Sequence, residues 1–244
     1  MIQSVHLLLF IMALSSGIVL LLRDWRITVS ALLVNYIIVA IFVAQQQLFV
    51  PNLLIARSIG TIVIIKLVTG IATTLILALT ALTFSKEYGL EDLDEFGLSE
   101  LRRAARAAQR QKTLHRPLGD YTLPFWALAL VLLVSLTLPR IYPIASSTLV
   151  DFAWYWLGLT GIFTLVTATD MLKVGLGLLL TVNSMDLLYT AVISTPQGSG
   201  VGIVPLGLLS LVTILLALAV AYLSGLLYGR LKTLELSALY QHYR

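Results

Sequence analysis

Seven long hydrophobic runs constrain this chain more than any other feature of its sequence. A helix needs about 17–25 mostly apolar residues to cross the hydrocarbon core of a bilayer. Runs of this length or longer, with few or no charges inside them, recur along the chain. We predict seven transmembrane helices, at residues 4–22, 27–49, 54–84, 123–142, 147–168, 171–193 and 202–228. The predicted fold class is therefore all-α, a polytopic membrane protein.

Composition supports a membrane protein and argues against a separate soluble domain. Of the 244 residues, 59% are hydrophobic and only 11% are charged, whereas an ordinary soluble domain carries about 25% charged residues. The longest polar stretch, residues 85–122, is too short and too charged to enclose a core of its own. We divide the chain into four segments: 1–84 with three helices, the charged loop 85–122, the fourth helix and its following loop at 123–146, and a three-helix segment with a tail at 147–244.

The residue inventory excludes several classes of catalytic and metal site. The chain has no cysteine and only three histidines, which form no ligand cluster with carboxylates, so disulfides and cysteine-ligated metal centres are excluded. No phosphate-binding loop, nucleophile elbow or zinc-protease motif occurs. We expect no catalytic site, cofactor or metal in this chain itself. Its cations cluster in one loop and at helix ends, which is not a nucleic-acid-binding pattern.

Lysines and arginines predict the orientation of the chain in the membrane. The loop 85–122 carries Lys86, five arginines and Lys112. Cytoplasmic loops are enriched in such residues, so we place this loop inside, the N-terminus outside and the C-terminus inside. Only Arg57 and Arg140 then lie on the outer side.

The charged loop has an acidic half, residues 86–97, and a basic, alanine-rich half, residues 99–112, which we expect to be helical from a Ser99 cap. Its charges can simply keep a solvated helix on the inner side. The alternative is a docking surface for a soluble or neighbouring subunit.

Two oppositely charged residues are predicted to lie at equal depth within the membrane. Lys66 follows the entry of the third helix near Ile59 by about seven residues, and Asp186 precedes the exit of the sixth helix near Ile193 by about seven. At about 1.5 Å per residue, both lie roughly 10 Å below the outer boundary of the hydrocarbon. Both must face protein or water, because a charge in lipid is expensive. They can pair directly, or each can bind a different helix or a neighbouring subunit.

Further polar residues complete a candidate proton or ion path. Asn183 shares a helix face with Asp186, and Asn35 is a mid-membrane amide on the second helix. We expect Asn35 to form a hydrogen bond to a neighbouring helix. Asp170 and Lys173, three positions apart at the inner end of the sixth helix, are expected to interact locally.

The outer boundary of the membrane is expected to hold hydrated charges and amphipathic aromatic rings. Asp151 and Arg140 fall at this boundary, where water can reach both side chains. Tryptophan and tyrosine are typical of membrane interfaces, so no cofactor need be invoked for the aromatic residues nearby. Those assigned to the interface are Trp126, Tyr142, Trp154 and Trp156.

The C-terminal helices resemble a known family of small membrane subunits. The stretches "KVGLGLLLTVNSMDLL" (173–188) and "LGLLSLVTILLALAVAYLSGLLYGRLKTLELSALYQ" (206–241) are similar to the NuoK family, the three-helix subunit of respiratory complex I, with relatives in Mrp-type antiporters. Gly177, Leu178 and Asn183 follow the pattern of that family's second helix.

Over its whole length the chain resembles the hydrogenase-4 component E group, in which further helices precede a NuoK-like half. The matching pieces are "RDWRITVSALLVNYIIVAIF" (23–42), Lys66, "TVNSMDLL" (181–188) and the tail "LKTLELSAL" (231–239). This resemblance implies a multi-pass protein of the prokaryotic cytoplasmic (inner) membrane. It also implies partners, namely antiporter-like subunits and the subunits of a quinone-reducing or hydrogenase module.

The chain departs from this family at the positions that carry its membrane glutamates. The glycine–leucine alignment puts the first of these glutamates at Leu179, and the span 202–228 has no acidic residue. Lys66 and Asp186 must then substitute, or the ion path belongs to a neighbouring subunit. The resemblance implies a membrane-arm subunit that links the redox module to ion-translocating subunits. A stand-alone secondary transporter and a purely structural scaffold are the alternatives.

Overall fold

The computed structural model describes residues 2–22, 24–47, 53–87, 119–145, 147–193 and 203–231. Within these ranges the chain forms helices joined by short connections, in agreement with the predicted all-α fold. The helices are α1 (Ile2–Leu21), α2 (Trp25–Gln47), α3 (Leu53–Glu87), α5 (Gly119–Ile141), α6 (Thr148–Val166), α7 (Met171–Ile193) and α8 (Ile203–Leu231). Most of the charged loop, including the helix expected at 99–112, lies outside the described residues.

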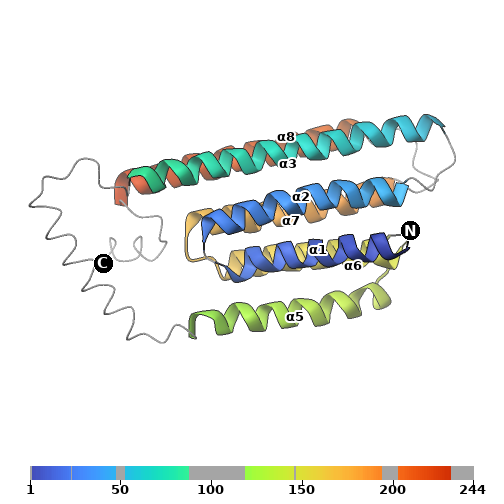
Figure 1. Ribbon diagram of the computed structural model, residues 1–244, viewed down its shortest axis with the longest axis horizontal. Helices are drawn as coiled ribbons and strands as arrows, with labels where there is room; N and C mark the ends of the chain where they lie inside the picture. Colours follow the sequence, from blue (N-terminus) through green and yellow to red (C-terminus); the bar gives the residue numbers. More distant parts are fainter. Residues whose placement is uncertain are drawn as a thin grey trace, which may run out of the picture.

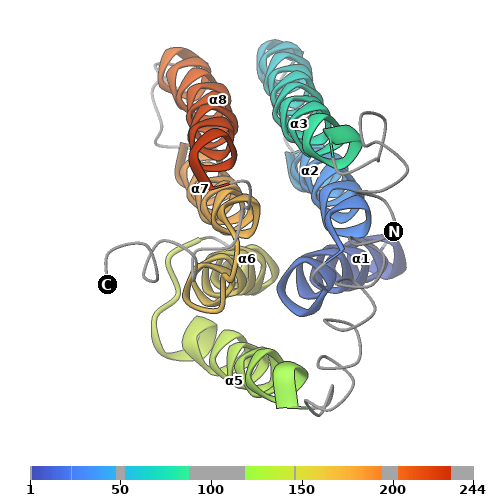
Figure 2. The same cartoon turned by 90° about the vertical axis from the view of Figure 1, so that its left-hand side faces the viewer.

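The helices are arranged as two rows that lie face to face. One row is α1–α2–α3 and the other is α6–α7–α8, so that α1 packs on α6, α2 on α7 and α3 on α8 (Figure 2). Helix α5 lies across the α1–α6 end of the rows and contacts both helices. Paired helices run in the same direction, and neighbours within a row are antiparallel (Figure 1).

Helix length and composition agree with membrane insertion. Six of the helices, α2, α3, α5, α6, α7 and α8, contain apolar segments long enough to cross a bilayer, and the apolar part of α1, Val5–Leu21, is shorter. The apolar helices therefore indicate a multi-pass integral membrane protein. Large apolar side chains also cover the outward surfaces of α3 and α8, as expected for helices whose solvent is hydrocarbon. They include Ile64, Val68, Ile71, Leu75, Leu208, Leu211 and Leu215.

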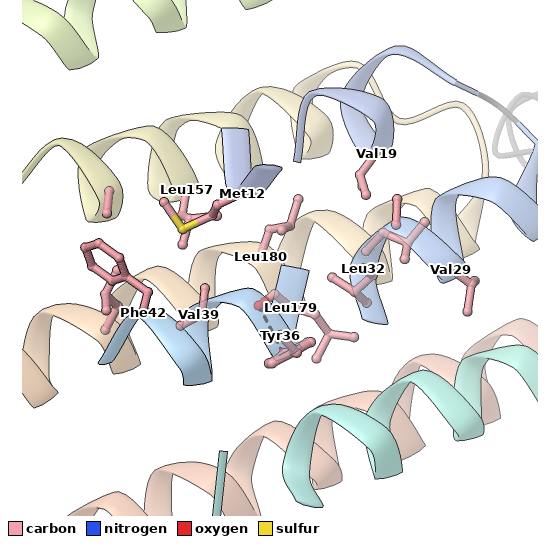
Figure 3. Close-up of a cluster of buried hydrophobic side chains, with 14 of the residues drawn as sticks. Met12, Val19, Val29, Leu32, Tyr36, Val39, Phe42, Leu157, Leu179 and Leu180 are labelled. Atoms are coloured by element: carbon pink, nitrogen blue, oxygen red, sulfur yellow. Dashed lines mark hydrogen bonds between the residues drawn. The ribbon is translucent and has the colours of Figure 1, made fainter. Parts of the chain in front are cut away.

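The buried core lies between the two rows, mainly among α1, α2, α6 and α7. Met12, Leu32, Leu157 and Leu180 point into this space from those four helices (Figure 3). Close approach of α6 and α7 depends on small residues. A Cβ added at Gly177 would lie 2.9 Å from the backbone nitrogen of Leu165, so even alanine would push these two helices apart.

Candidate functional site

Lys66 and Asp186 meet inside the bundle as an ion pair. Nζ of Lys66 donates to Oδ2 of Asp186 and lies 3.5 Å from the Asp186 carbonyl oxygen. The lysine side chain is 4% exposed and the aspartate side chain 14%. The sequence left open whether Lys66 and Asp186 pair directly or bind different partners, and in the structure they pair directly.

The pair sits at the junction of four helices. Helix α3, which carries Lys66, packs on α2 and α8, and α7, which carries Asp186, packs on the same two helices. The lysine and the aspartate therefore meet in the space between these four helices. Lys66 is about six residues from the start of its apolar segment, Gly60–Thr83, and Asp186 about six from the end of its own, Met171–Val192. Because α3 and α7 run in opposite directions, these positions fall at one level.

Asp186 is only partly satisfied by this contact. Its Oδ1 atom is buried and accepts no hydrogen bond from any described residue. Its carbonyl oxygen, in contrast, accepts from Thr190 Oγ1 at 2.6 Å. An ionised carboxylate offers about four acceptor positions, and buried polar atoms nearly always find a donor. Oδ1 is therefore the oxygen of this carboxylate that no described side chain or backbone group engages.

A second set of polar contacts begins one helical turn away from Asp186. Asn183 Nδ2 donates to Asn35 Oδ1 at 3.1 Å, and Asn35 Nδ2 donates to Ser15 Oγ at 3.0 Å and to the Met12 carbonyl at 3.2 Å. Asn35 thus forms the interhelical hydrogen bond expected of it. These contacts tie α7 to α2 and α2 to α1, in the buried middle of the bundle.

The same polar band continues to α6 through a tryptophan. Trp156 Nε1 donates to Ser16 Oγ at 2.7 Å, and Ser16 Oγ donates to the Met12 carbonyl at 3.0 Å. The assignment of Trp156 to a membrane interface was wrong, because its ring is buried against α1. An indole N–H can donate a hydrogen bond but cannot accept one. The series of polar contacts therefore ends at Trp156, which cannot pass a proton onward.

Asp170 and Lys173 lie near the other end of α7 and do not join the ion pair. The Lys173 backbone nitrogen donates to Asp170 Oδ1 at 2.7 Å, which is the predicted local interaction, and Lys173 Nζ donates to the Leu20 carbonyl at 3.0 Å. Thirteen positions of helix separate Lys173 from Asp186, which corresponds to roughly 20 Å. Asp170 caps α7, and Lys173 binds the C-terminal turn of α1.

Asp151 is not the hydrated boundary residue expected from the sequence. It is fully buried at the start of α6. Its carboxylate accepts from the backbone nitrogens of Ile144 and Ala145, at 3.2 and 2.9 Å, and from Trp154 Nε1 at 3.0 Å. The carboxylate closes the connection between α5 and α6 and interacts favourably with the helix N-terminus. Arg140, in contrast, is exposed.

Tyr36 is a residue of the site that the sequence interpretation missed. It extends from α2 toward α7, where its hydroxyl donates to the Leu179 carbonyl at 3.4 Å (Figure 3). On its other side the ring covers Gly70 of α3, where an added Cβ would come within 2.5 Å of the tyrosine Cβ. The one signal in the sequence was a tyrosine directly after Asn35 in an apolar helix.

Together these contacts make a site suited to holding a charge or a proton. An ammonium and a carboxylate in contact can exchange a proton with no change in net charge, and the open carboxylate oxygen can accept one from elsewhere. Among the described residues, no three histidine, aspartate or glutamate side chains gather in a cluster that could hold a metal ion. The chain matches no protein-family model, no curated protein and no solved structure.

Proposed function

We propose that this chain is a membrane-arm subunit of a complex I-related energy-converting complex of the hydrogenase-4 or Mrp-like type, and that Lys66 and Asp186 take part in its proton path. The observation that carries the proposal is the buried ion pair with one carboxylate oxygen left open. A charge buried within a membrane protein is costly, and such residues commonly belong to proton or ion pathways. The similarity of residues 173–188 and 206–241 to NuoK supplies the type of complex.

The chemistry of the step is a proton transfer within the pair. The proton moves from the Lys66 ammonium to the Asp186 carboxylate, leaving an amine and a carboxylic acid, and a second acceptor then takes the proton from the acid. The transferred proton is on Oδ2, so the carboxyl group must turn about its Cβ–Cγ bond to carry that proton to the side where Oδ1 now lies, from which it can leave. The Lys66 amine then takes up the next proton, which restores the ion pair. Release toward a neighbouring subunit would couple this chain to the larger ion-translocating subunits.

The orientation and the partners belong to the same proposal. Positive residues in the loop 85–122 favour that loop on the cytoplasmic side of a prokaryotic inner membrane, with the N-terminus outside. The apolar outward surfaces of α3, α5 and α8 are available to antiporter-like subunits and to lipid. In this arrangement the chain links the redox module to the ion-translocating subunits and binds no redox cofactor of its own.

The first test is purification of the chain from its native membrane in a mild detergent, followed by mass spectrometry of the whole assembly. Stable co-purification with antiporter-like and redox subunits is the expected result. A homogeneous, solitary protein that still transports ions would replace the subunit proposal with a stand-alone transporter.

The second test is Asp186→Asn in the assembled complex, measured as proton uptake by inverted membrane vesicles. Loss of uptake with the complex intact is expected, because the amide cannot accept the proton. Asp24→Asn is the matched control, since Asp24 is exposed and its side-chain Oδ1 accepts from the nearby Arg26 backbone nitrogen, a contact that the asparagine oxygen can keep. Unchanged uptake in Asp186→Asn would leave the pair a structural contact and favour the scaffold.

A further inference from the structure

We infer that Thr190 is a positioning residue for the ion pair: its hydroxyl occupies the main-chain carbonyl oxygen of Asp186 and so keeps the Lys66 ammonium on the carboxylate. The inference rests on the proposed function and adds to it a residue that is not among the candidates for the proton path drawn from the sequence. Thr190 takes no part in the proton transfer itself.

Lys66 has two acceptors on the same residue. Its Nζ atom donates to the carboxylate oxygen Oδ2 of Asp186, and the main-chain carbonyl oxygen of Asp186 lies 3.5 Å from Nζ. Hydrogen bonds from nitrogen to oxygen usually measure about 2.7–3.2 Å, so the carbonyl contact is long. A peptide carbonyl is a far weaker base than a carboxylate and cannot take the proton. The choice between the two oxygens therefore decides whether the ammonium is placed for transfer.

The carbonyl oxygen of Asp186 is already occupied by Thr190. A carbonyl oxygen has two lone pairs. Within α7 one of them accepts from the backbone N–H four residues later, which is that of Thr190. The other accepts from Thr190 Oγ1 at 2.6 Å. The ammonium can reach this oxygen only as a third and longer contact, so the threonine hydroxyl leaves the carboxylate as the better acceptor for Lys66.

Burial gives this competition its effect. Thr190 is 2% exposed and Lys66 is 4% exposed, so the carbonyl cannot turn to bulk water if the hydroxyl is removed. Buried polar atoms nearly always find a donor, and the Lys66 ammonium already lies beside this oxygen. Removal of the hydroxyl should therefore draw Nζ toward the carbonyl and away from Oδ2.

The bond that Thr190 makes is a common one, but its acceptor is not. Threonines that donate to the carbonyl four residues earlier include Thr73, Thr164, Thr181 and Thr213. Thr190 makes the same local bond, but to the carbonyl of the residue that pairs with Lys66. Thr164 is the matched control, because it is fully buried and donates at the same distance, 2.6 Å, to the carbonyl of the uncharged Thr160.

The experiment compares Thr190→Val, which removes the hydroxyl, with Thr190→Ser, which keeps it, and with Thr164→Val. The first readout is the infrared carboxylate band of Asp186 in the purified protein, identified by its absence in Asp186→Asn. We expect the band to shift in Thr190→Val, because the ammonium moves off the carboxylate, and to keep its wild-type position in the other two variants. An unmoved band in Thr190→Val would overturn the inference, and so would an equal shift in Thr190→Ser or Thr164→Val.

The second readout is the rate of proton uptake by the assembled complex. Thr190→Val should lower this rate by about five- to tenfold, the effect of one hydrogen bond on the population of the reactive geometry. Thr190→Ser should stay near the wild-type rate. Wild-type uptake in Thr190→Val, with none in Asp186→Asn, would contradict the inference. Full uptake in Asp186→Asn would instead refute the proposed function, and the infrared band would still decide whether Thr190 positions the pair.

Discussion

Two aspartates of the same helix row, the buried Asp151 on α6 and the partly buried Asp186 on α7, are held in opposite ways. Asp151 accepts from two backbone nitrogens and an indole and has no lysine or arginine partner among the described residues. Asp186 has a lysine partner on Oδ2, and no residue in the described part of the chain donates to its Oδ1. The first carboxylate accepts from groups of fixed charge, and the second depends on one titratable side chain, that of Lys66.

This difference separates a structural carboxylate from a candidate functional one. Backbone and indole donors cannot change their charge, so Asp151 has no reason to change state. The Asp186 site loses its charge balance when a proton leaves the pair that Asp186 forms with Lys66. Burial alone does not distinguish the two residues, since Asp151 is the more deeply buried. The two residues are distinguished by their partners, which have fixed charge for Asp151 and are titratable for Asp186.

The largest expected effect is a loss of stability when the Asp186 carboxylate is removed. Asp186→Leu leaves the Lys66 ammonium buried without its carboxylate, and breaking a buried pair in this way destabilises a protein by about 3–5 kcal/mol. Lys66→Met combined with Asp186→Leu should recover most of that loss, because no charge remains. Reversible unfolding in mixed micelles measures both. A double variant as unstable as the single one would contradict this account of the pair.

The next effect concerns Asp151. Asp151→Ala leaves its three donors without an acceptor, and we expect a loss of about 2–3 kcal/mol in the same unfolding measurement. Asp151→Asn keeps one oxygen acceptor and should lose about half as much. Proton uptake by the folded complex should stay at the wild-type level in both variants. Selective loss of uptake without loss of stability would break the distinction between the two aspartates.

A third aspartate, Asp170, tests whether capping carboxylates in general behave as Asp151 does. Its oxygen accepts from the Lys173 backbone nitrogen at the start of α7. Asp170→Ala should cost about 1 kcal/mol, the usual value for loss of an N-cap, whereas Asp170→Asn should be nearly neutral. Equal, large losses of uptake in both variants would instead place Asp170 in the ion path.

The smallest effect belongs to the neutral contact beside the pair. Asn35→Ala and Asn183→Ala form a double-mutant cycle whose coupling energy we expect to be about 0.6 kcal/mol, typical of hydrogen bonds between membrane helices. Thermal unfolding of the two single variants and the double variant gives this value. A coupling of several kcal/mol would make the amide contact, not the ion pair, the dominant polar interaction of the bundle.

The sequence predicted the helices because long apolar runs have one favourable structure in a membrane. It also predicted that Lys66 and Asp186 lie at one depth, since depth follows from helical rise. It could not predict the positions of Trp156, Asp151 and Tyr36, which depend on how the helices rotate and which helix packs on which. An apolar helix has little amphipathic pattern to reveal its rotation, and the partners are far apart in sequence.

Proton uptake by vesicles containing the complex with Lys66→Met and Asp186→Leu tests the central claim most directly. The double variant removes both charges and leaves an apolar, packed junction, so stability and assembly should be retained. The account predicts an intact complex that takes up no protons through this path. Wild-type uptake by an intact double variant would contradict it.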